Sequence, residues 1–175
     1  MLRTRVPARS FSLYEGDYRR AGARSHGPRL SGKIFPTAQD AENAFYEALE
    51  RCDLEGMMAV WAEDEDIVCV HPAGGRLCGQ DEVRESWARI FAAGPRARVT
   101  IEQQVALTGM MLAVHSVFER FVIPQVKPEA QPAPIIATNV YLRTPAGWRM
   151  IVHHASPAPA QAQNAPRDAG PKILH

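Results

Sequence analysis

The sequence predicts an α+β fold in which helices pack on one face of a mostly antiparallel sheet. Segments with the apolar spacing of helices come first, at residues 38–51, 54–61 and 81–91. A short apolar strand at residues 67–70 interrupts them. Four longer strand-like segments then follow one another, at residues 97–107, 110–123, 135–144 and 148–156. Helices followed by a run of strands are typical of α+β domains.

The predicted helices have recognisable beginnings and ends. Thr37 and Asp53 are polar residues of the kind that cap helices, and Cys52-Asp53 separates the first helix from the second. The first two helices carry apolar side chains at helical spacing: Ala41, Ala44, Phe45, Ala48 and Leu49, then Leu54, Met57, Met58 and Trp61. The third places Val83, Trp87, Ile90 and Phe91 on one side and ends at Gly94-Pro95.

The strand boundaries are marked by turn residues. His71-Pro72 ends the short strand, because proline has no N–H to donate to a neighbouring strand. Thr108-Gly109 and Pro145-Ala146-Gly147 are hairpin turn signals, and the Pro-rich residues 124–134 form an irregular loop. The four later strands are therefore expected to form an antiparallel meander.

Composition divides the 175 residues into three parts. Residues 1–35 hold eight basic and two acidic residues and form a basic arm that we expect to be disordered. Residues 36–157 form the domain, and residues 158–175 form an Ala/Pro-rich tail. The chain from residue 36 onward holds 12 basic and 17 acidic residues, so nucleic acid is not expected as a partner.

The sequence also argues against a metal site, a cofactor and a membrane span. Cys52, Cys69 and Cys78 contain no C-x-x-C pair, which favours free thiols in a reducing compartment and a cytoplasmic location. The histidines are scattered, and no H-E-x-x-H motif or Gly-rich phosphate loop is present, so no metal or cofactor is predicted. No apolar run approaches the roughly 18 residues that a membrane span needs.

Several short strings, in this order and spacing, resemble the SnoaL-like branch of the NTF2-like superfamily over residues 38–157. They are Ala44-Phe45-Tyr46, Asp53-Leu54-Glu55-Gly56-Met57, Val70-His71-Pro72, Gly79-Gln80-Asp81-Glu82-Val83, Ser86-Trp87, Ala137-Thr138-Asn139-Val140, and Gly147-Trp148 through His153-His154-Ala155-Ser156-Pro157. The resemblance implies an NTF2-like cone, with three N-terminal helices packed on a curved, mostly antiparallel sheet around a pocket. This fold hosts enzymes, binding proteins and oligomerisation modules alike.

The resemblance extends to the ketosteroid isomerases, whose chemical positions are replaced here. His71 occupies the position of their general-base aspartate, and Asn139 that of their second oxyanion-hole acid. Phe45 stands where they have a catalytic tyrosine, with Tyr46 one residue away. A neutral histidine can accept a proton near neutral pH, and an asparagine amide can donate to a developing oxyanion. The open alternative is that His71 only hydrogen-bonds the loop after it.

Strand alternation extends the predicted pocket. If Asn139 faces inward, Ala137 and Tyr141 do too. On the last strand, the resemblance turns Val152, His154 and Ser156 inward and Arg149, Ile151 and His153 outward. The predicted catalytic residues are His71, Asn139 and His154; the predicted ligand-binding residues are Phe45, Tyr46, Trp61, Cys69, Trp87, Tyr141, Val152 and Ser156. For the two tryptophans, core packing is the competing interpretation. His115 is interpreted as a surface or satisfied core histidine.

Three functions compete at this stage. The first is an isomerase, dehydratase or cyclase that acts without a cofactor on a small, largely apolar carbonyl compound. In it, His71 is the base, Asn139 the oxyanion donor and His154 a second acid or base. The second is a non-catalytic binder of an apolar metabolite. The third is a homodimerisation module that associates through the outer sheet face, around Ile151 and His153.

Overall fold

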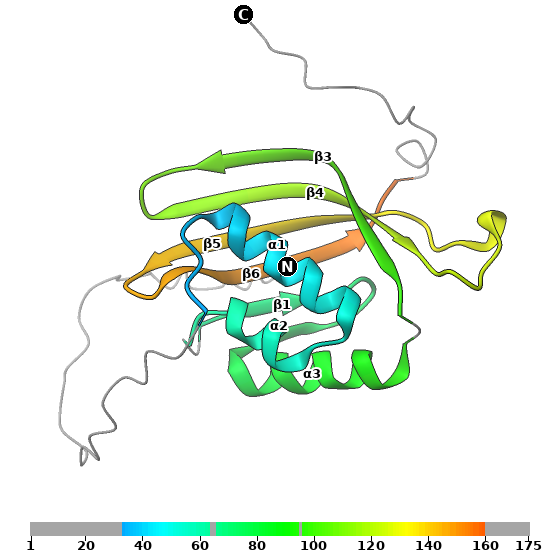
Figure 1. Cartoon of the computed structure of the whole chain (residues 1–175), viewed down its shortest axis with the longest axis horizontal. Helices are drawn as coiled ribbons and strands as arrows, with labels where there is room; N and C mark the ends of the chain where they lie inside the picture. The colour runs from blue at the N-terminus through cyan, green and yellow to red at the C-terminus, as the bar shows by residue number, and fades with distance from the viewer. Residues whose placement is uncertain (1–32, 64–65, 95, 160–175) are drawn as a thin grey trace, which may run out of the picture.

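Figure 1 shows the computed structural model, which describes residues 33–63, 66–94 and 96–159. Most of the predicted basic arm and nearly all of the predicted tail lie outside these residues. Phe35 is already part of the core, with 2% of its surface exposed, one residue before the predicted start of the domain.

The fold prediction is confirmed, because three helices lie against one curved, open sheet. The helices are α1 (Ala38–Arg51), α2 (Leu54–Val60) and α3 (Gly79–Ala93), with a short 3-10 turn, η1 (Pro128–Ala130). The strands are β1 (Val68–Val70), β2 (Arg76–Cys78), β3 (Arg98–Thr108), β4 (Leu112–Val122), β5 (Ile135–Thr144) and β6 (Gly147–Pro157). Strand β2 was not predicted.

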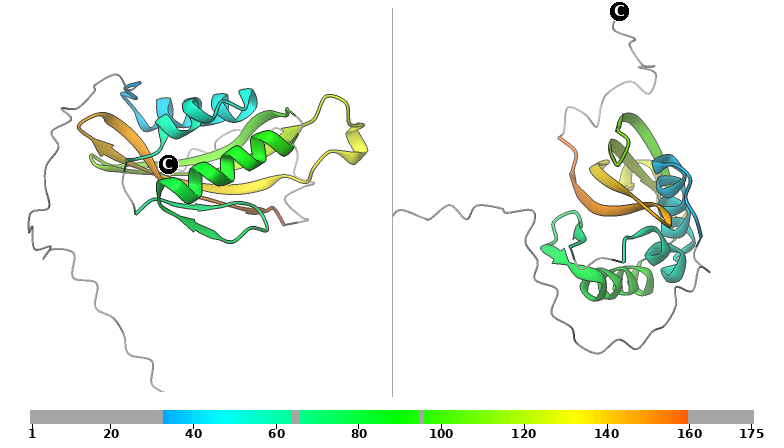
Figure 2. Two further views of the ribbon diagram at one scale, coloured as in Figure 1. Left: turned by 90° about the horizontal axis from the view of Figure 1, so that it is seen from below. Right: turned by 90° about the vertical axis from the view of Figure 1, so that its left-hand side faces the viewer.

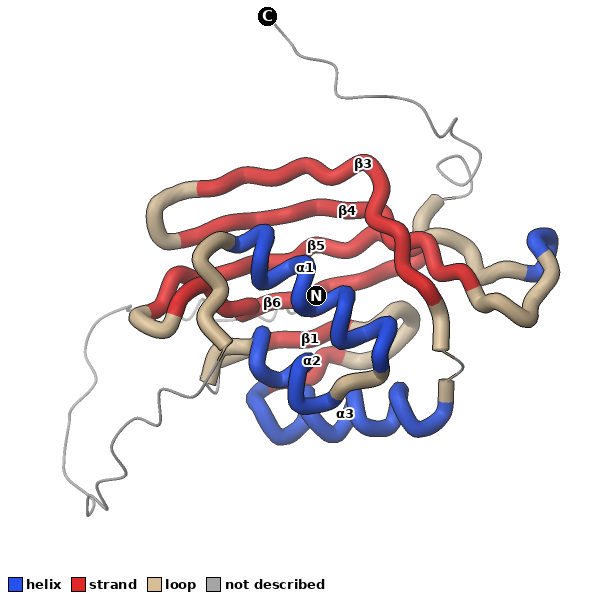
Figure 3. The backbone as a smooth tube through the Cα atoms, viewed as in Figure 1, coloured by secondary structure: helices blue, strands red, loops and turns tan. Residues whose placement is uncertain are grey.

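The strands are ordered β2-β1-β6-β5-β4-β3, and every neighbouring pair is antiparallel except β1 with β6. Helix α1 lies across the sheet and contacts β3, β5 and β6, whereas α3 contacts β1 and β2 (Figure 3). The two further views in Figure 2 show how strongly the sheet curves.

The predicted helix caps are confirmed. The Thr37 side chain accepts a hydrogen bond from the Asp40 backbone N–H, and the Thr37 N–H donates to the Asp40 carboxylate, both at 3.0 Å. This capping box satisfies two N–H groups at the start of α1. The Asp53 side chain accepts from the Gly56 N–H at 2.9 Å and begins α2.

The turn between β5 and β6 requires glycine. Gly147 has a φ of 94°, a region that side chains with a Cβ rarely adopt. A Cβ at this position would lie 2.7 Å from the carbonyl oxygen of Phe35. The close approach lets Trp148 N–H donate to that oxygen at 2.8 Å, which ties the segment before α1 to the sheet.

A bulge in β6 reverses the face to which its later residues point. Val140 pairs with Val152 and Tyr141 with Met150, so Ile151 has no counterpart on β5. Such an extra residue shifts the alternation of side chains by one. The inward residues of β6 are therefore Trp148 and Met150 before the bulge, and His153 and Ala155 after it.

The predicted orientation of β6 is consequently wrong. His153 lies directly opposite Asn139, and residues in such a cross-strand pair share one face. Because Asn139 faces inward, His153 does too, with 3% of its surface exposed. His154 and Ser156 are exposed on the other face, and Val152 is half-buried. The inward prediction for Ala137 and Tyr141 agrees with their complete burial.

Large side chains fill the space between the helices and the inner sheet face. Those with less than 2% exposure include Phe45, Met57, Trp61, Tyr141 and Met150. No helix in the described ranges is long and apolar enough to cross a membrane. The three cysteines are free.

Candidate functional site

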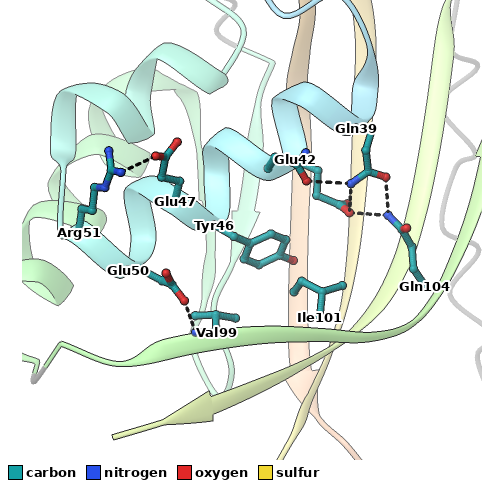
Figure 4. A pocket seen from close by; sticks show the side chains of 10 residues that line it. Gln39, Glu42, Tyr46, Glu47, Glu50, Arg51, Val99, Ile101 and Gln104 are labelled. Atoms are coloured by element: carbon teal, nitrogen blue, oxygen red, sulfur yellow. Dashed lines mark hydrogen bonds and ion pairs between the residues drawn. The ribbon is translucent and has the colours of Figure 1, made fainter. Parts of the chain in front are cut away.

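A cavity of about 530 Å³ lies between α1 and β3 (Figure 4). Cavities of this size hold small molecules in many proteins. One face of α1 and the first part of β3 line it: Gln39, Glu42, Asn43, Tyr46, Glu47, Glu50, Arg51, Val99, Ile101 and Gln104. The lining includes the ion pair between Glu47 and Arg51, whose oxygen and nitrogen are 2.6 Å apart. All of the lining residues except Val99 and Ile101 have polar side chains.

Glu42 is a buried carboxylate at this cavity, with 1% of its surface exposed. It projects from the face of α1 that otherwise carries apolar side chains. Donors from four elements converge on it: His115 Nδ1 at 2.8 Å, Tyr141 hydroxyl at 3.3 Å, Gln104 Nε2 at 2.5 Å, Gln39 Nε2 at 3.4 Å and Asn139 Nδ2 at 3.5 Å. A buried carboxylate is tolerated when donors surround it in this way.

Gln104 reaches this cluster because of a second bulge. The pairing of β3 with β4 shifts between Glu102 and Val105, and Gln103 has a φ of 50°. Bulges often re-aim side chains beside functional sites. Here the bulge brings the Gln104 amide to Glu42 at one end of the cavity, as Figure 4 shows.

Glu119, on β4, is a second buried carboxyl group and is 2% exposed. Its Oε1 accepts a hydrogen bond from the Tyr46 hydroxyl at 2.7 Å. Burial raises the pKa of Glu119 to about 7, and the nearby charge of Glu42 adds to the rise, whereas the Tyr46 hydrogen bond opposes it. Glu119 therefore changes protonation state near neutral pH, which is the property of a general acid or base.

Tyr46 connects Glu119 with the cavity. Burial, and then the charge of Glu119, raise the pKa of Tyr46 far above its usual value, so its hydroxyl stays protonated. The hydroxyl donates to Glu119 and accepts from Asn139 Nδ2 at 3.0 Å. The Tyr46 side chain also lines the cavity. Glu119 itself does not line the cavity, so Tyr46 is the side chain that joins it to the lining.

Asn139 is held in turn by His153. The Asn139 Oδ1 and His153 Nδ1 atoms are 2.8 Å apart, and both side chains are buried. Complete burial lowers the pKa of His153 to about 3, and the neighbouring His71 and His154 add to this effect. His153 is therefore neutral near pH 7 and donates its single N–H to the amide oxygen.

His71 lies on the other side of His153, away from the residues that line the cavity. Its Nε2 is 2.6 Å from the Ser86 hydroxyl and 3.7 Å from the Cys69 sulfur. The Trp87 ring packs edge-on against it, with centroids 4.7 Å apart. Burial lowers the pKa of His71. The His71 and His153 ring centroids are 6.4 Å apart.

The structure does not bring the three predicted catalytic residues together. Asn139 lies inside the buried network, His71 contacts α3, and His154 is exposed on the opposite sheet face. Of the eight predicted ligand-binding residues, Tyr46 lines the cavity and the Tyr141 hydroxyl binds Glu42. Core packing accounts for Phe45, Trp61, Cys69 and Trp87. Val152 and Ser156 do not line the cavity.

The sequence reasoning missed Glu42 and Glu119, although both left a signal. Glu42 occupies a position of α1 between the apolar Ala38, Phe45 and Leu49. Glu119 continues the series of alternate, buried residues that Ala113, His115 and Val117 form along β4. A carboxyl group on an otherwise apolar face is costly unless it has partners, and it therefore marks a polar cluster or functional site. His115 is a satisfied core histidine, one of the two interpretations made from the sequence.

Comparison with known proteins shows that this chain is similar to solved structures, two of which are more than 30% identical to it. The solved structures include a candidate calcium/calmodulin-dependent protein kinase type II association domain from Thiobacillus denitrificans. It is 39% identical, with a TM-score of 0.68, over 73% of this chain and 99% of that one. A candidate dehydratase of the NTF2-like family from Streptomyces avermitilis is 32% identical, with a TM-score of 0.62, over 69% of this chain and 92% of that one.

An NTF2-like protein of unknown function from Pseudomonas putida is 22% identical and shares the fold, with a TM-score of 0.60 over 76% of this chain and 93% of that one. The comparison with curated proteins gives no match. The model of the SnoaL-like domain matches residues 39–161, which include all of α1 except its first residue and every other helix and strand described above. The chain belongs to the SnoaL-like domain family, within the NTF2-like fold.

Proposed function

We propose that a small molecule binds in the cavity between α1 and β3, and that the protein transfers a proton to or from an oxygen-bearing group of this molecule. Glu119 is the acid or base, and Tyr46 carries its proton to the cavity. The observation that supports this most directly is the 2.7 Å hydrogen bond between a buried carboxyl group and a tyrosine that lines the cavity. The reaction class is isomerisation or dehydration beside a carbonyl group.

Whether the Tyr46 hydroxyl donates or accepts in its hydrogen bond with Glu119 depends on whether Glu119 is protonated. When Glu119 is ionised, the Tyr46 hydroxyl donates to it. When Glu119 is protonated, its own O–H can donate to the tyrosine oxygen, which leaves the tyrosine proton free for an oxygen in the cavity. If Tyr46 then gives that proton to a carbonyl or departing hydroxyl oxygen, the proton of Glu119 replaces it. The net transfer is from Glu119 to the ligand oxygen. In an isomerisation, water in the cavity takes the proton from the carbon beside the carbonyl and water protonates the far carbon of the enol, while the enol hydroxyl returns its proton through Tyr46 to Glu119. In a dehydration, the proton of Glu119 leaves with the departing water, and the proton taken from the carbon restores Glu119 through solvent.

This proposal assigns different roles from those expected from the sequence. The Asn139 amide donates to Tyr46, so it supports the hydroxyl that meets the ligand. His71 is held by Ser86 and is not among the cavity residues. The ligand that fits is polar at one end rather than purely apolar, since Val99 and Ile101 are the two aliphatic side chains among the described residues of the lining. The candidate dehydratase at 32% identity supports this reaction class.

The test uses 3-cyclohexenone, a small β,γ-unsaturated ketone whose conversion to the conjugated isomer is followed by ultraviolet absorbance. We expect Tyr46→Phe and Glu119→Gln to lower the rate by about 10²-fold or more, the usual contribution of a general acid or base. Glu85→Gln, which changes an exposed carboxyl group on α3, is the matched control and should keep the full rate. Equal rates in all four proteins would rule out the Glu119–Tyr46 mechanism.

The same probe distinguishes a catalyst from a non-catalytic binder. Binding is observed as NMR shifts of the Val99 and Ile101 methyl groups, which line the cavity. A probe that shifts these methyl groups but is recovered unchanged would support the binder. In that case the buried network serves only to orient the ligand.

We also propose that two copies of the chain associate through the outer sheet face, because that face carries a surface of apolar side chains. Cross-strand pairs extend it over four strands: Leu107–Val114, Val114–Val140, Val140–Val152, Leu112–Leu142 and Phe118–Ile136. Leu107 and Leu112 are 67% and 46% exposed. Exposed apolar surfaces of this extent mark interaction sites. His153, expected on this surface from the sequence, is buried on the inner face instead.

The relative at 39% identity, a candidate association domain, supports self-association. Light scattering should give the mass of a dimer for the wild-type protein and that of a monomer for Leu107→Arg. The exposed position of Leu107 means that the substitution should not unfold the chain. Gln125→Arg, in the exposed loop after β4, is the control and should remain dimeric. A monomeric wild-type protein at all concentrations would contradict the association.

A further inference from the structure

We propose that His153 is a positioning residue which, through Asn139, fixes the direction of the hydrogen bonds at Tyr46. This inference rests on the proposed function of Glu119 and Tyr46 and adds a third and a fourth member to their network. His153 does not touch the cavity, so its effect is transmitted through the Asn139 amide.

Three successive hydrogen bonds connect His153 to Glu119. His153 Nδ1 and Asn139 Oδ1 are 2.8 Å apart, Asn139 Nδ2 and the Tyr46 oxygen 3.0 Å, and the Tyr46 oxygen and Glu119 Oε1 2.7 Å. All four side chains are at most 7% exposed. Water has little access to Glu119, Asn139 and His153, so breaking the bond between Asn139 and His153 leaves buried polar atoms unpaired.

The two carboxylates set the direction of this chain of hydrogen bonds. An ionised Glu119 can only accept, so Tyr46 donates to it and presents a lone pair to Asn139. The Asn139 amide must then direct its NH₂ toward Tyr46, where the Glu42 carboxylate is also 3.5 Å away. The opposite amide orientation would face Asn139 Oδ1 toward these oxygens, which is repulsive. The amide oxygen consequently points to His153.

His153 supplies the donor that this orientation needs. Its ring is packed among aromatic neighbours, with centroid distances of 5.1 Å to Phe45 and 6.2 Å to Trp87. A neutral imidazole carries one N–H, and the Asn139 oxygen selects the tautomer with the proton on Nδ1. The charged or titratable groups that act on His153 are His71 and His154, and both disfavour a second proton. The donor is therefore constant across the pH range in which Glu119 titrates.

The bulge at Ile151 is what places a histidine here. With regular alternation from Met150 onward, His154 would face inward and His153 outward. The extra residue brings His153 opposite Asn139 instead. Without His153, the Asn139 oxygen would lose its donor, and the amide would be free to tilt away from Tyr46. Tyr46 would then be a poorer donor to Glu119, because hydrogen bonds in a chain strengthen one another.

The experiment is a pH titration of the Glu119 side-chain carboxyl by ¹³C NMR in four proteins. The wild type should titrate with a midpoint near 7. His153→Phe keeps an aromatic ring but removes the donor, and should raise the midpoint by roughly half a unit, a fraction of one charge-assisted hydrogen bond. His153→Gln, which retains an N–H donor, should restore most of the wild-type value. His154→Phe, on the exposed face, is the matched control and should change nothing.

A second measurement does not depend on any variant folding. The ¹⁵N shifts of His153 in the wild-type protein should show a neutral ring with its proton on Nδ1. A proton on Nε2, or a Glu119 midpoint near 7 that His153→Phe does not move, would overturn the positioning role and leave the proposed function intact. A wild-type Glu119 midpoint at the ordinary value near 4.5 would instead overturn the proposed function.

Discussion

Replacement of Glu119 by glutamine should change how the stability of the protein depends on pH. The folded protein raises the pKa of Glu119 from 4.5 to about 7, chiefly by burial. Between these values the folded state binds a proton that the unfolded state releases, so the free energy of unfolding falls as pH rises. The stability linked to Glu119 is fully present below about pH 4.5 and is lost as pH rises through about 7.

The size of the effect follows from the shift. A difference of about two and a half units, at about 1.4 kcal/mol per unit, corresponds to roughly 3 kcal/mol. Glutamine cannot ionise, yet its amide oxygen can still accept from Tyr46. The free energy of unfolding of Glu119→Gln relative to wild type should therefore increase by about 3 kcal/mol between pH 4.5 and pH 8. At pH 8 the variant should be the more resistant to urea.

The assay is urea unfolding at four pH values, followed by the fluorescence of Trp61, Trp87 and Trp148. Using the difference between variant and wild type cancels the contributions of other groups, such as the buried His153. Glu85→Gln, in an exposed position, is the control and should stay parallel to wild type. If Glu119→Gln also stays parallel to wild type across this range, Glu119 does not titrate near neutral pH and the reasoning fails.

Four further substitutions test the buried network, the strand register and the turn before β6. Tyr46→Phe should lower the free energy of unfolding by about 1–3 kcal/mol, and by more above pH 7, because ionised Glu119 loses its donor. Urea unfolding at pH 6 and pH 8 measures this difference. His153→Ala should cost about 2 kcal/mol or more, and His154→Ala less than about 0.5, by the same assay. Gly147→Ala should lower the stability by about 1–3 kcal/mol in thermal unfolding, since its Cβ would meet Phe35.

The elements of the fold could be predicted because each is encoded locally. Thr37 and Asp53 cap helices by interactions with residues three positions away, and the hairpin turns depend on single glycines such as Gly147. The order of helices and strands then limits the arrangement to a few topologies. The resemblance to the SnoaL-like branch narrowed these further. Strand β2, Arg76–Cys78, was missed because Leu77 is its one aliphatic residue, whereas β1, of the same length, is an apolar run.

The site was harder to predict because it depends on register. A single extra residue at Ile151 exchanges the environments of His153 and His154, and no turn residue in the sequence marks this bulge. Gln104 likewise reaches Glu42 only because of the irregularity at Gln103. Hydrogen bonds between residues far apart in the sequence, such as Tyr46 and Glu119, which are 73 positions apart, depend on the strand register in the same way. The sequence shows which types of side chain are available, but only the structure shows which of them come together.

Cys69 offers an independent test of how closed the interior is. It is fully buried on β1, and burial, with the charge of Glu119, raises its pKa to about 12. At pH 8 only about one in 10⁴ such thiols is ionised, and the thiolate is the reactive form. Iodoacetamide should therefore modify the exposed Cys78 at least about 10³-fold faster than Cys69, as measured by mass spectrometry of peptides.

In urea the two thiols should react at similar rates, which serves as the control for intrinsic reactivity. Rapid modification of Cys69 in the folded protein would mean that reagents reach the inner face of the sheet beside His71, whose Nε2 lies 3.7 Å from the Cys69 sulfur. The burial that raises the pKa of Glu119 would then be incomplete, because Cys69 and Glu119 are close enough to influence each other electrostatically. Slow modification of Cys69 is the result expected if the interior that holds Glu119 is closed.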